Sequence, residues 1–294
     1  MAGEQRRHPD SSLDMPDTAH GLNYIITKVR SMDSKPEAVR GGAGYIHGSS
    51  LIGMCPRRHC LSILSGAGSK VPRACDRLLW AIGRAVEAHI RGQFIEAVQR
   101  AGVIGEWRCK CGGLSSEGLF VRRTKCKTCQ GTAQRYGELT LLDHDARIAG
   151  NPDLMYLRPD NHKVRTAEIK SINKKEFDAL TAPKVDHVFQ ALIYRRLAIL
   201  NLMDVDDTIS IIYGCKDYAF RGIPYHEFYV TSTPEHDAAL DRMWANARLV
   251  RDFVNARKAN PESSPPLPAR LALCPHPNTV TAKDCDQCHA CHAR

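Results

Sequence analysis

The chain has 294 residues, 43% of them hydrophobic, and no apolar run approaches the roughly 18 residues that a membrane span needs. Lysine and arginine total 41 against 32 aspartate and glutamate, a net charge of +9 that suits a polyanionic partner, although a scattered surface excess would give the same total. The composition therefore excludes a membrane protein and favours a soluble globular one. No apolar signal region is present at the N-terminus, so we expect a cytoplasmic protein.

Twelve cysteines in a chain of this kind indicate metal ligation rather than disulfides. Four lie within residues 109–129 and four within residues 274–291, whereas the others are scattered. Metal sites in two separate parts of the chain are therefore expected.

The N-terminal segment, residues 1–48, is polar, and we predict that it is partly disordered. Ser49 or Ser50 would then cap a short helix that runs into Cys55. From the residues alone, Cys55 is either a buried free thiol or a metal ligand.

Apolar residues at helical spacing predict an amphipathic helix over residues 76–101. Gly83 lies one turn before Glu87, so the small residue and the acid share a face and leave room beside the carboxylate. His89 faces elsewhere and is the weaker candidate for a role at the same place. A solvent-exposed Glu87 without a special role is the alternative.

Two cysteine pairs predict a zinc ribbon at residues 105–135. Each pair is followed by glycine and would form a tight knuckle that presents two thiolates, and two knuckles complete a tetrahedral site. The four cysteines are Cys109, Cys111, Cys126 and Cys129. Because this insert is rich in lysine and arginine, it could face nucleic acid, but it could equally serve folding alone.

The next region carries acids and a lysine on predicted strands. Residues 136–148 read as one strand, and residues 154–157 and 164–172 read as a hairpin. Alternation along the second strand puts Glu168 and Lys170 on one face and Ile169 in the core, with Asp153 able to sit opposite. Two carboxylates and an ammonium suit hydrolysis of a phosphodiester with Mg²⁺ or Mn²⁺, although such residues also occur on ordinary solvated hairpins.

The remaining chain predicts two helices, a strand pair and a cysteine-bearing tail. A helix over residues 183–201 would place His187, Gln190 and Tyr194 on one face. Residues 207–213 and 224–232 alternate like antiparallel strands, and a helix follows Ser232 and ends near residue 259. Beyond a proline-rich linker, the tail contains the cysteines Cys274, Cys285, Cys288 and Cys291.

Four motifs occur in a recognisable order. They are Gly83-x-x-x-Glu87, Gly150-x-Pro-Asp153, Glu168-x-Lys170 and Gln190-x-x-x-Tyr194. This series resembles the PD-(D/E)XK nuclease superfamily, and most closely its RecB-type branch, with the CRISPR-adaptation iron–sulfur exonucleases and phage-encoded relatives. The resemblance implies an α/β, restriction-endonuclease-like core over residues 49–260, in which helices flank a mixed central sheet. The zinc ribbon would be an insert in this core, and residues 261–294 would form a cysteine-bound C-terminal clasp.

The resemblance also implies roles for the motif residues. Asp153, Glu168 and the carbonyl oxygen of Ile169 would hold Mg²⁺ or Mn²⁺, assisted by Glu87. Lys170 would orient the attacking water and stabilise the charged transition state. Gln190 and Tyr194 would position the DNA strand.

In relatives with an iron–sulfur cluster, one cysteine near the start of the core joins three from the C-terminus. The candidates here number five for four places: Cys55, Cys274, Cys285, Cys288 and Cys291. The resemblance favours a [4Fe–4S] cluster, whereas a second zinc site made from the tail alone, with His276 or His289, is the alternative.

The implied activity is DNA degradation by an exonuclease that acts on single strands or duplex ends. Phage or prophage recombination or replication, with the corresponding proteins as partners and the host cytoplasm as location, is the implied setting. A structure-specific endonuclease and a catalytically idle DNA-binding adaptor are the alternatives. The four intact motifs argue against the adaptor.

Overall fold

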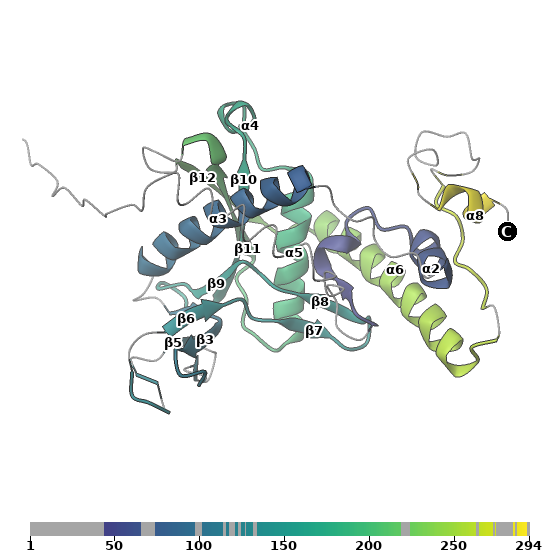
Figure 1. Cartoon of the computed structure of the whole chain (residues 1–294), viewed down its shortest axis with the longest axis horizontal. Coiled ribbons are helices and arrows are strands. Elements are labelled where there is room, and N and C mark those ends of the chain that lie inside the picture. Colours follow the sequence, from purple (N-terminus) through teal and green to yellow (C-terminus); the bar gives the residue numbers. More distant parts are fainter. Residues whose placement is uncertain are drawn as a thin grey trace, which may run out of the picture. The chain divides into compact units, whose positions relative to one another are not determined.

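Figure 1 shows the computed structural model of the chain. It describes residues 44–65, 74–97, 102–113, 116–117, 121–122, 125–126, 128–131, 134–218, 224–262, 265–272, 274, 285 and 287–292. Most of the predicted N-terminal segment, residues 1–43, lies outside the described residues. Of these described residues, 74–81 belong to one compact unit and the others to a second, which carries every site discussed below. The predicted domain boundaries stay predictions.

A mixed sheet of seven strands forms the centre of the second unit, in the order β12-β11-β10-β9-β2-β5-β4. Only β10 and β11 run parallel; their neighbours pair antiparallel. The strands are β2 (Val103–Ile104), β4 (Ser116–Glu117), β5 (Val121–Arg122), β9 (Leu154–Leu157), β10 (Val164–Ile172), β11 (Thr208–Cys215) and β12 (Tyr225–Thr231). The predicted hairpin is therefore β9–β10, and the predicted strand pair is β11–β12.

Helices cover both faces of this sheet (Figure 1). Ile211 and Ile212 are neighbours in β11 and so point to opposite faces. Ile212 packs in one cluster with Val86 of α3, whereas Ile211 packs in another with Leu192 of α5. The two α-helices α3 and α5 thus flank opposite faces, as the mixed α/β prediction requires.

The helices are α2 (Pro56–Ser65), α3 (Ala74–Ala97), α4 (Lys174–Asp178), α5 (Val185–Leu200), α6 (Pro234–Ala259) and α8 (Cys288–His292), with two 3₁₀ turns, η2 (Gly48–Leu51) and η3 (Lys216–Tyr218). The N-cap of α6 is Thr233, whose hydroxyl accepts the N–H of His236 in a capping box. Among the helices that the structure describes, none is long and apolar enough to cross a membrane.

The expected single strand over residues 136–148 is wrong. Strand β6 (Gln134–Gly137) pairs with β3 (Glu106–Cys109), whereas β7 (Leu141–Asp143) and β8 (Ile148–Gly150) form a separate sheet with β1 (Ile46–His47). The chain turns after β7 because the Asp143 carboxylate accepts the N–H of Ala146 at 2.9 Å, a side-chain-to-backbone bond that stabilises turns.

The expected helix from Ser49 to Cys55 is also wrong. Gly48–Leu51 forms a 3₁₀ turn, and the helix α2 begins only at Pro56. Proline suits the first helical position because its missing N–H is not needed there. Cys55 precedes it, and its sulfur accepts the N–H of Arg58 at 3.4 Å. Cys55 therefore occupies the capping position of α2.

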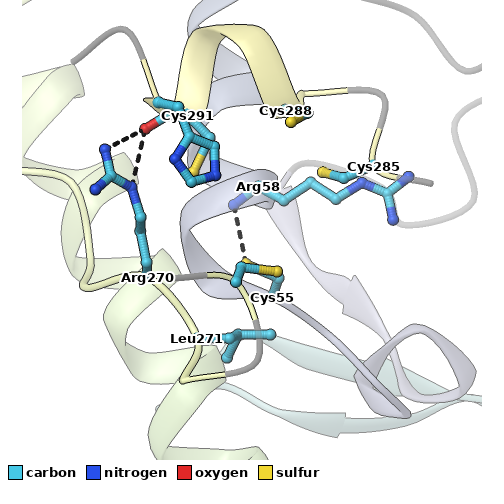
Figure 2. Close-up of a pocket in the computed structure, with 9 residues that line it drawn as sticks. Cys55, Arg58, Arg270, Leu271, Cys285, Cys288 and Cys291 are labelled. Carbon is cyan, nitrogen blue, oxygen red and sulfur yellow. Dashed lines mark hydrogen bonds between the residues drawn. The ribbon is translucent and has the colours of Figure 1, made fainter. Parts of the chain in front are cut away.

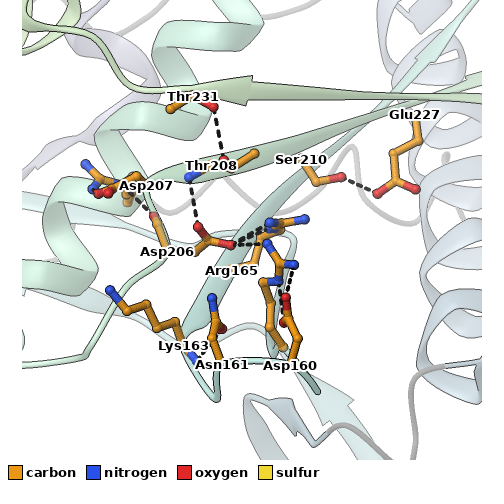
Figure 3. Close-up of polar contacts among 12 residues, drawn as sticks. Asp160, Asn161, Lys163, Arg165, Asp206, Asp207, Thr208, Ser210, Glu227 and Thr231 are labelled. Carbon is orange, nitrogen blue, oxygen red and sulfur yellow. Dashed lines mark hydrogen bonds and ion pairs between the residues drawn. The ribbon is translucent and has the colours of Figure 1, made fainter.

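A buried charge network joins the first residues of β10 to the segment before β11 (Figure 3). The Asp206 carboxylate accepts hydrogen bonds from Arg158 at 2.9 Å and from Nε of Arg165 at 3.0 Å. Its main-chain carbonyl accepts from Arg195 of α5 at 2.8 Å. Burial opposes ionisation of Asp206, but the two arginines outweigh it and lower the pKa of the carboxyl. The network anchors β9, β10 and α5 to the start of β11.

Two glycines allow close contact with Tyr194 of α5. A Cβ on Gly150 would lie 2.7 Å from Leu197 Cδ1 and 2.8 Å from two ring carbons of Tyr194. A Cβ on Gly48 would lie 3.1 Å from the same ring. The Tyr194 ring is therefore enclosed by backbone, and only 2% of the residue is exposed.

Gly150→Ala is expected to lower the free energy of unfolding by about 1–3 kcal/mol, because the new methyl group forces β8 away from α5. Gly92→Ala is the matched control, since a Cβ there meets nothing within 4 Å and alanine favours the helix α3. Chemical denaturation measures both. Equal stability of Gly150→Ala and wild type would contradict the packing described here.

Candidate active site

The four motifs meet at the first residue of β9, where this strand stops pairing with β10. The last pair of this hairpin is Leu154 with Ala167, so β10 continues without a partner on that side. The Asp153 carboxylate takes the missing place, and its Oδ2 accepts the N–H of Ile169 at 2.8 Å. Because N–H and C=O of one residue point to the same side of a strand, the Ile169 carbonyl also points toward Asp153.

Glu168 lies at the centre of this site and is 1% exposed. Its carboxylate contacts the ammonium of Lys170, on the same face of β10. In the part of the chain that the structure describes, neither oxygen has any other donor. Burial, with the nearby charge of Asp153, raises the pKa of Glu168 well above its ordinary value, and Lys170 offsets only part of this effect.

Glu87 approaches from α3 and is half-buried. Its Oε1 accepts the hydroxyl of Ser171 at 3.2 Å. A Cβ on Gly83 would lie 2.9 Å from that hydroxyl oxygen, so the glycine allows the helix to lie close to β10. Burial and the charge of Asp153 raise the pKa of Glu87. His89, two residues further along the helix, is exposed.

Two further charged residues belong to the site, and the motifs did not identify them. Arg91 lies one helical turn after Glu87; its Nη1 is 2.8 Å from Glu138 Oε1, and its Nη2 is 3.8 Å from Asp153 Oδ1. Burial raises the pKa of Glu138 although Arg91 opposes this. The four-residue step from Glu87 to Arg91 was the available signal for the arginine, whereas nothing in the spacing singled out Glu138.

Charge is unbalanced at this place. Four carboxylates face the two cationic groups of Lys170 and Arg91, which leaves two formal negative charges. The carboxylates belong to Glu87, Glu138, Asp153 and Glu168. Excess negative charge beside a buried carboxylate without a full set of donors is chemically suited to a hard divalent cation. No three of these acids bring their carboxylate oxygens within 4.8 Å of one another. Among the described residues, only a cysteine cluster brings three or more possible ligand atoms so close.

Helix α5 contributes polar side chains next to the acids. Gln190 Nε2 donates to the hydroxyl of Tyr194 at 3.1 Å, and burial with the charge of Glu168 raises the pKa of that tyrosine. His187 Nδ1 lies 2.8 Å from the hydroxyl of Tyr213. Burial and the charge of Lys170 lower the pKa of His187 to about 4, so this imidazole is neutral at pH 7.

The first cysteine group forms a cluster that could hold a metal ion. All four sulfurs lie within 4.8 Å of one another, with 3.5 Å between Cys109 and Cys129 and 3.7 Å between Cys111 and Cys126. Each pair sits in a knuckle closed by main-chain bonds: the Cys109 carbonyl accepts the N–H of Gly112, and the Cys126 carbonyl accepts that of Gln130. Main-chain N–H groups lower the pKa of Cys126 to about 6 and so favour the thiolate.

The second cysteine group surrounds one pocket (Figure 2). Its lining comprises Cys55, Arg58, Arg270, Leu271, Cys274, Cys285, Cys288, Cys291 and His292. The tail is fixed there because the Cys291 carbonyl accepts from Arg57 at 3.3 Å and from Arg270 at 2.8 Å. All five cysteines that were candidates for a shared site are thus brought to one place.

The sequence matches no protein-family model and no curated protein. The crystal structure of the alkaline exonuclease LHK-Exo from Laribacter hongkongensis is similar over 73% of this chain and 93% of its own, with 13% identity and a TM-score of 0.42. The crystal structure of LHK-Exo in complex with dAMP is similar over 74% of this chain and 95% of its own, with 14% identity and a TM-score of 0.41. At TM-scores below 0.5, these similarities carry no argument about the family or the reaction.

Without added Mg²⁺ or Mn²⁺, stability should fall as pH rises above the ordinary glutamate pKa of 4.5. A carboxyl with a raised pKa in the folded state binds its proton more tightly there than in the unfolded chain, so its stabilising effect is lost as pH rises through the folded pKa. Glu168→Gln should therefore show a shallower decline between about pH 5 and pH 8 in denaturation experiments.

The exposed Glu96 of α3 supplies the control, and Glu96→Gln should keep the wild-type pH dependence. If Glu168→Gln declined as steeply as wild type, the buried carboxylate would not be the source of the effect.

Proposed function

We propose that this protein is a metal-dependent DNA nuclease of the RecB-type PD-(D/E)XK group, with a restriction-endonuclease-like core, and that it acts as an exonuclease on single strands or duplex ends. The observation that carries the proposal is the buried Glu168 carboxylate, which has Lys170 as its only donor among the described residues and lies near Asp153 and Glu87. A purely structural acid at such a place would be unfavourable, because burial of an incompletely paired charge is costly.

The residues at this place fit Mg²⁺ or Mn²⁺. Asp153, Glu168 and the Ile169 carbonyl would hold the cation, with Glu87 alongside, and all offer the oxygen ligands that these ions prefer. When bound, the cation would withdraw charge from the phosphodiester and make water a better nucleophile. Arg91 of α3 forms ion pairs with both Asp153 and Glu138.

Lys170 would place a positive charge beside the reacting phosphate. Burial lowers the pKa of this ammonium, but the charges of Glu168 and Asp153 raise the pKa by more than burial lowers it, so the group stays protonated. Gln190 would contact the DNA backbone, and the buried Tyr194 would act through Gln190, whose side chain it holds by a hydrogen bond. The neutral imidazole of His187 would line the same region.

Zinc is our assignment for Cys109, Cys111, Cys126 and Cys129. A Zn–S bond of about 2.3 Å in a tetrahedron places neighbouring sulfurs about 3.8 Å apart. The separations of 3.5 and 3.7 Å lie close to this value.

A [4Fe–4S] cluster held by four of the five pocket cysteines is the matching proposal for the C-terminal clasp. Among the described residues, no three of these thiols approach within 4.8 Å of one another, so they are spread more widely than the ligands of a single zinc ion. In a [4Fe–4S] cluster each thiolate binds a different iron, and wider spacing follows.

Asp153→Asn should reduce cleavage of end-labelled linear DNA at least about 100-fold, because a ligand of the activating cation is lost. The assay compares single-stranded, double-stranded and circular DNA with Mg²⁺, Mn²⁺ or EDTA. Asp178→Asn changes an exposed acid of α4 and should retain full activity.

The outcomes separate the alternatives. Loss of linear but not circular DNA supports the exonuclease, whereas cutting of circles indicates a structure-specific endonuclease. Binding without cleavage in every condition would favour a catalytically idle adaptor. Full activity of purified Asp153→Asn would contradict the assignment.

The two cysteine groups should hold different metals. In protein purified without oxygen, Cys111→Ser should reduce zinc from about one ion per chain to less than half and leave iron unchanged, whereas Cys288→Ser should reduce iron alone. Cys75→Ser, at an exposed cysteine outside both groups, should change neither. Mass spectrometry of metals and the visible absorbance measure this. Two zinc ions and no iron would instead support the second zinc site.

A further inference from the structure

The ribbon strands β3 and β6 connect the four-cysteine cluster to the candidate active site. Their register pairs Trp107 with Tyr136 and Cys109 with Gln134, so the aromatic pair lies two residues from the knuckles. Trp107 is 2% exposed, and its ring meets that of Tyr136 edge to face with centroids 5.4 Å apart. The knuckles thus hold together the two strands that carry this pair.

Tyr136 reaches from the ribbon to Asp153. Its hydroxyl lies 3.4 Å from the main-chain carbonyl oxygen of Asp153 and 3.5 Å from that of Ile104. Burial raises the pKa of Tyr136, so the hydroxyl keeps its proton as a donor. A Cβ on Gly105 would lie only 2.3 Å from a ring carbon of Tyr136, so this glycine leaves the space that the ring occupies.

Arg91 completes the connection from α3. Its guanidinium lies 5.9 Å from the centre of the Tyr136 ring and forms the ion pair with Glu138, two residues further along the chain. The same guanidinium lies 3.8 Å from Asp153 Oδ1. Asp153 is therefore restrained at three points: its carbonyl by Tyr136, one carboxylate oxygen by the Ile169 N–H, and the other by Arg91.

We propose that Tyr136, with Arg91 and Glu138, positions the Asp153 carboxylate for cation binding, and that the four-cysteine ribbon serves the site by holding Tyr136 in place. The inference rests on the proposed function for its choice of Mg²⁺ or Mn²⁺ as the cation. In this proposal the ribbon stabilises the active site and does not form a separate lobe for binding nucleic acid. These three are positioning residues, since they act through Asp153.

The decisive variant is Tyr136→Phe, which removes the hydroxyl and keeps both the ring and the charge of the site. Glu138→Gln is less selective, because the loss of a negative charge near the cation weakens binding without any change in position. Tyr225→Phe is the matched control: Tyr225 is an exposed tyrosine of the edge strand β12.

The measurement is Mn²⁺ affinity of the full-length, zinc-loaded protein, titrated by electron paramagnetic resonance, together with zinc content and thermal unfolding. We expect Tyr136→Phe to bind Mn²⁺ about threefold to tenfold more weakly, the effect of one hydrogen bond, while zinc content stays at the wild-type level. Cleavage at saturating Mn²⁺ should recover to within about twofold of wild type, because only cation binding is impaired.

Unchanged Mn²⁺ affinity in Tyr136→Phe, or equal weakening in Tyr225→Phe, would overturn the inference. If wild type binds Mn²⁺ and the variant binds it more weakly, but neither cleaves DNA, the positioning role holds and the proposed function fails. If wild type cleaves DNA and the variant keeps its affinity, the function holds and the positioning role fails. If the wild-type protein binds no Mn²⁺, both the positioning role and the proposed function are contradicted.

Discussion

The burial of Glu168 beside other acids is the interaction on which the rest of the site depends. Like charges in a poorly solvated place repel strongly, and Lys170 compensates for only part of this repulsion. The carboxylate cannot move to water, because the β10 backbone at Glu168 pairs with Ile211 of β11 and the N–H of Ile169 donates to Asp153. The fold thus holds at this place an acid whose ionised form a cation would stabilise.

Such a site needs stabilising interactions elsewhere along the same strand. The Asp206 network supplies them, since Asp206 accepts hydrogen bonds from Arg165 of β10 and from Arg195 of α5. Figure 3 shows Arg165 beside Asp206. Unlike Glu168, Asp206 has several donors, and its pKa is lowered rather than raised. Two buried acids close to one β-strand therefore have opposite environments: one is satisfied and structural, and the other is left with spare ligand capacity.

Local sequence patterns predicted those parts of the structure whose contacts are local. Alternation predicted the β9–β10 hairpin and the face shared by Glu168 and Lys170, and the paired cysteines predicted two knuckles that converge. The strand over residues 136–148 failed because a turn bond from Asp143 outweighs strand propensity. The ion pair of Arg91 with Glu138 joins a helix to a segment 47 residues later, and no periodicity reports such a contact.

The two cysteine groups lie beside short secondary-structure elements. Strands β3 and β6 have four residues each, and α8 has five, lengths that are marginal without further support. Ligation to a metal would supply that support, because it would close loops that hydrogen bonds alone hold weakly. In the ribbon the same ligation would hold the strands on which Trp107 packs against Tyr136, whose hydroxyl reaches the backbone of Asp153. Short strands held by a metal would thus suffice to restrain Asp153, because one aromatic pair connects them to the hydroxyl that contacts it.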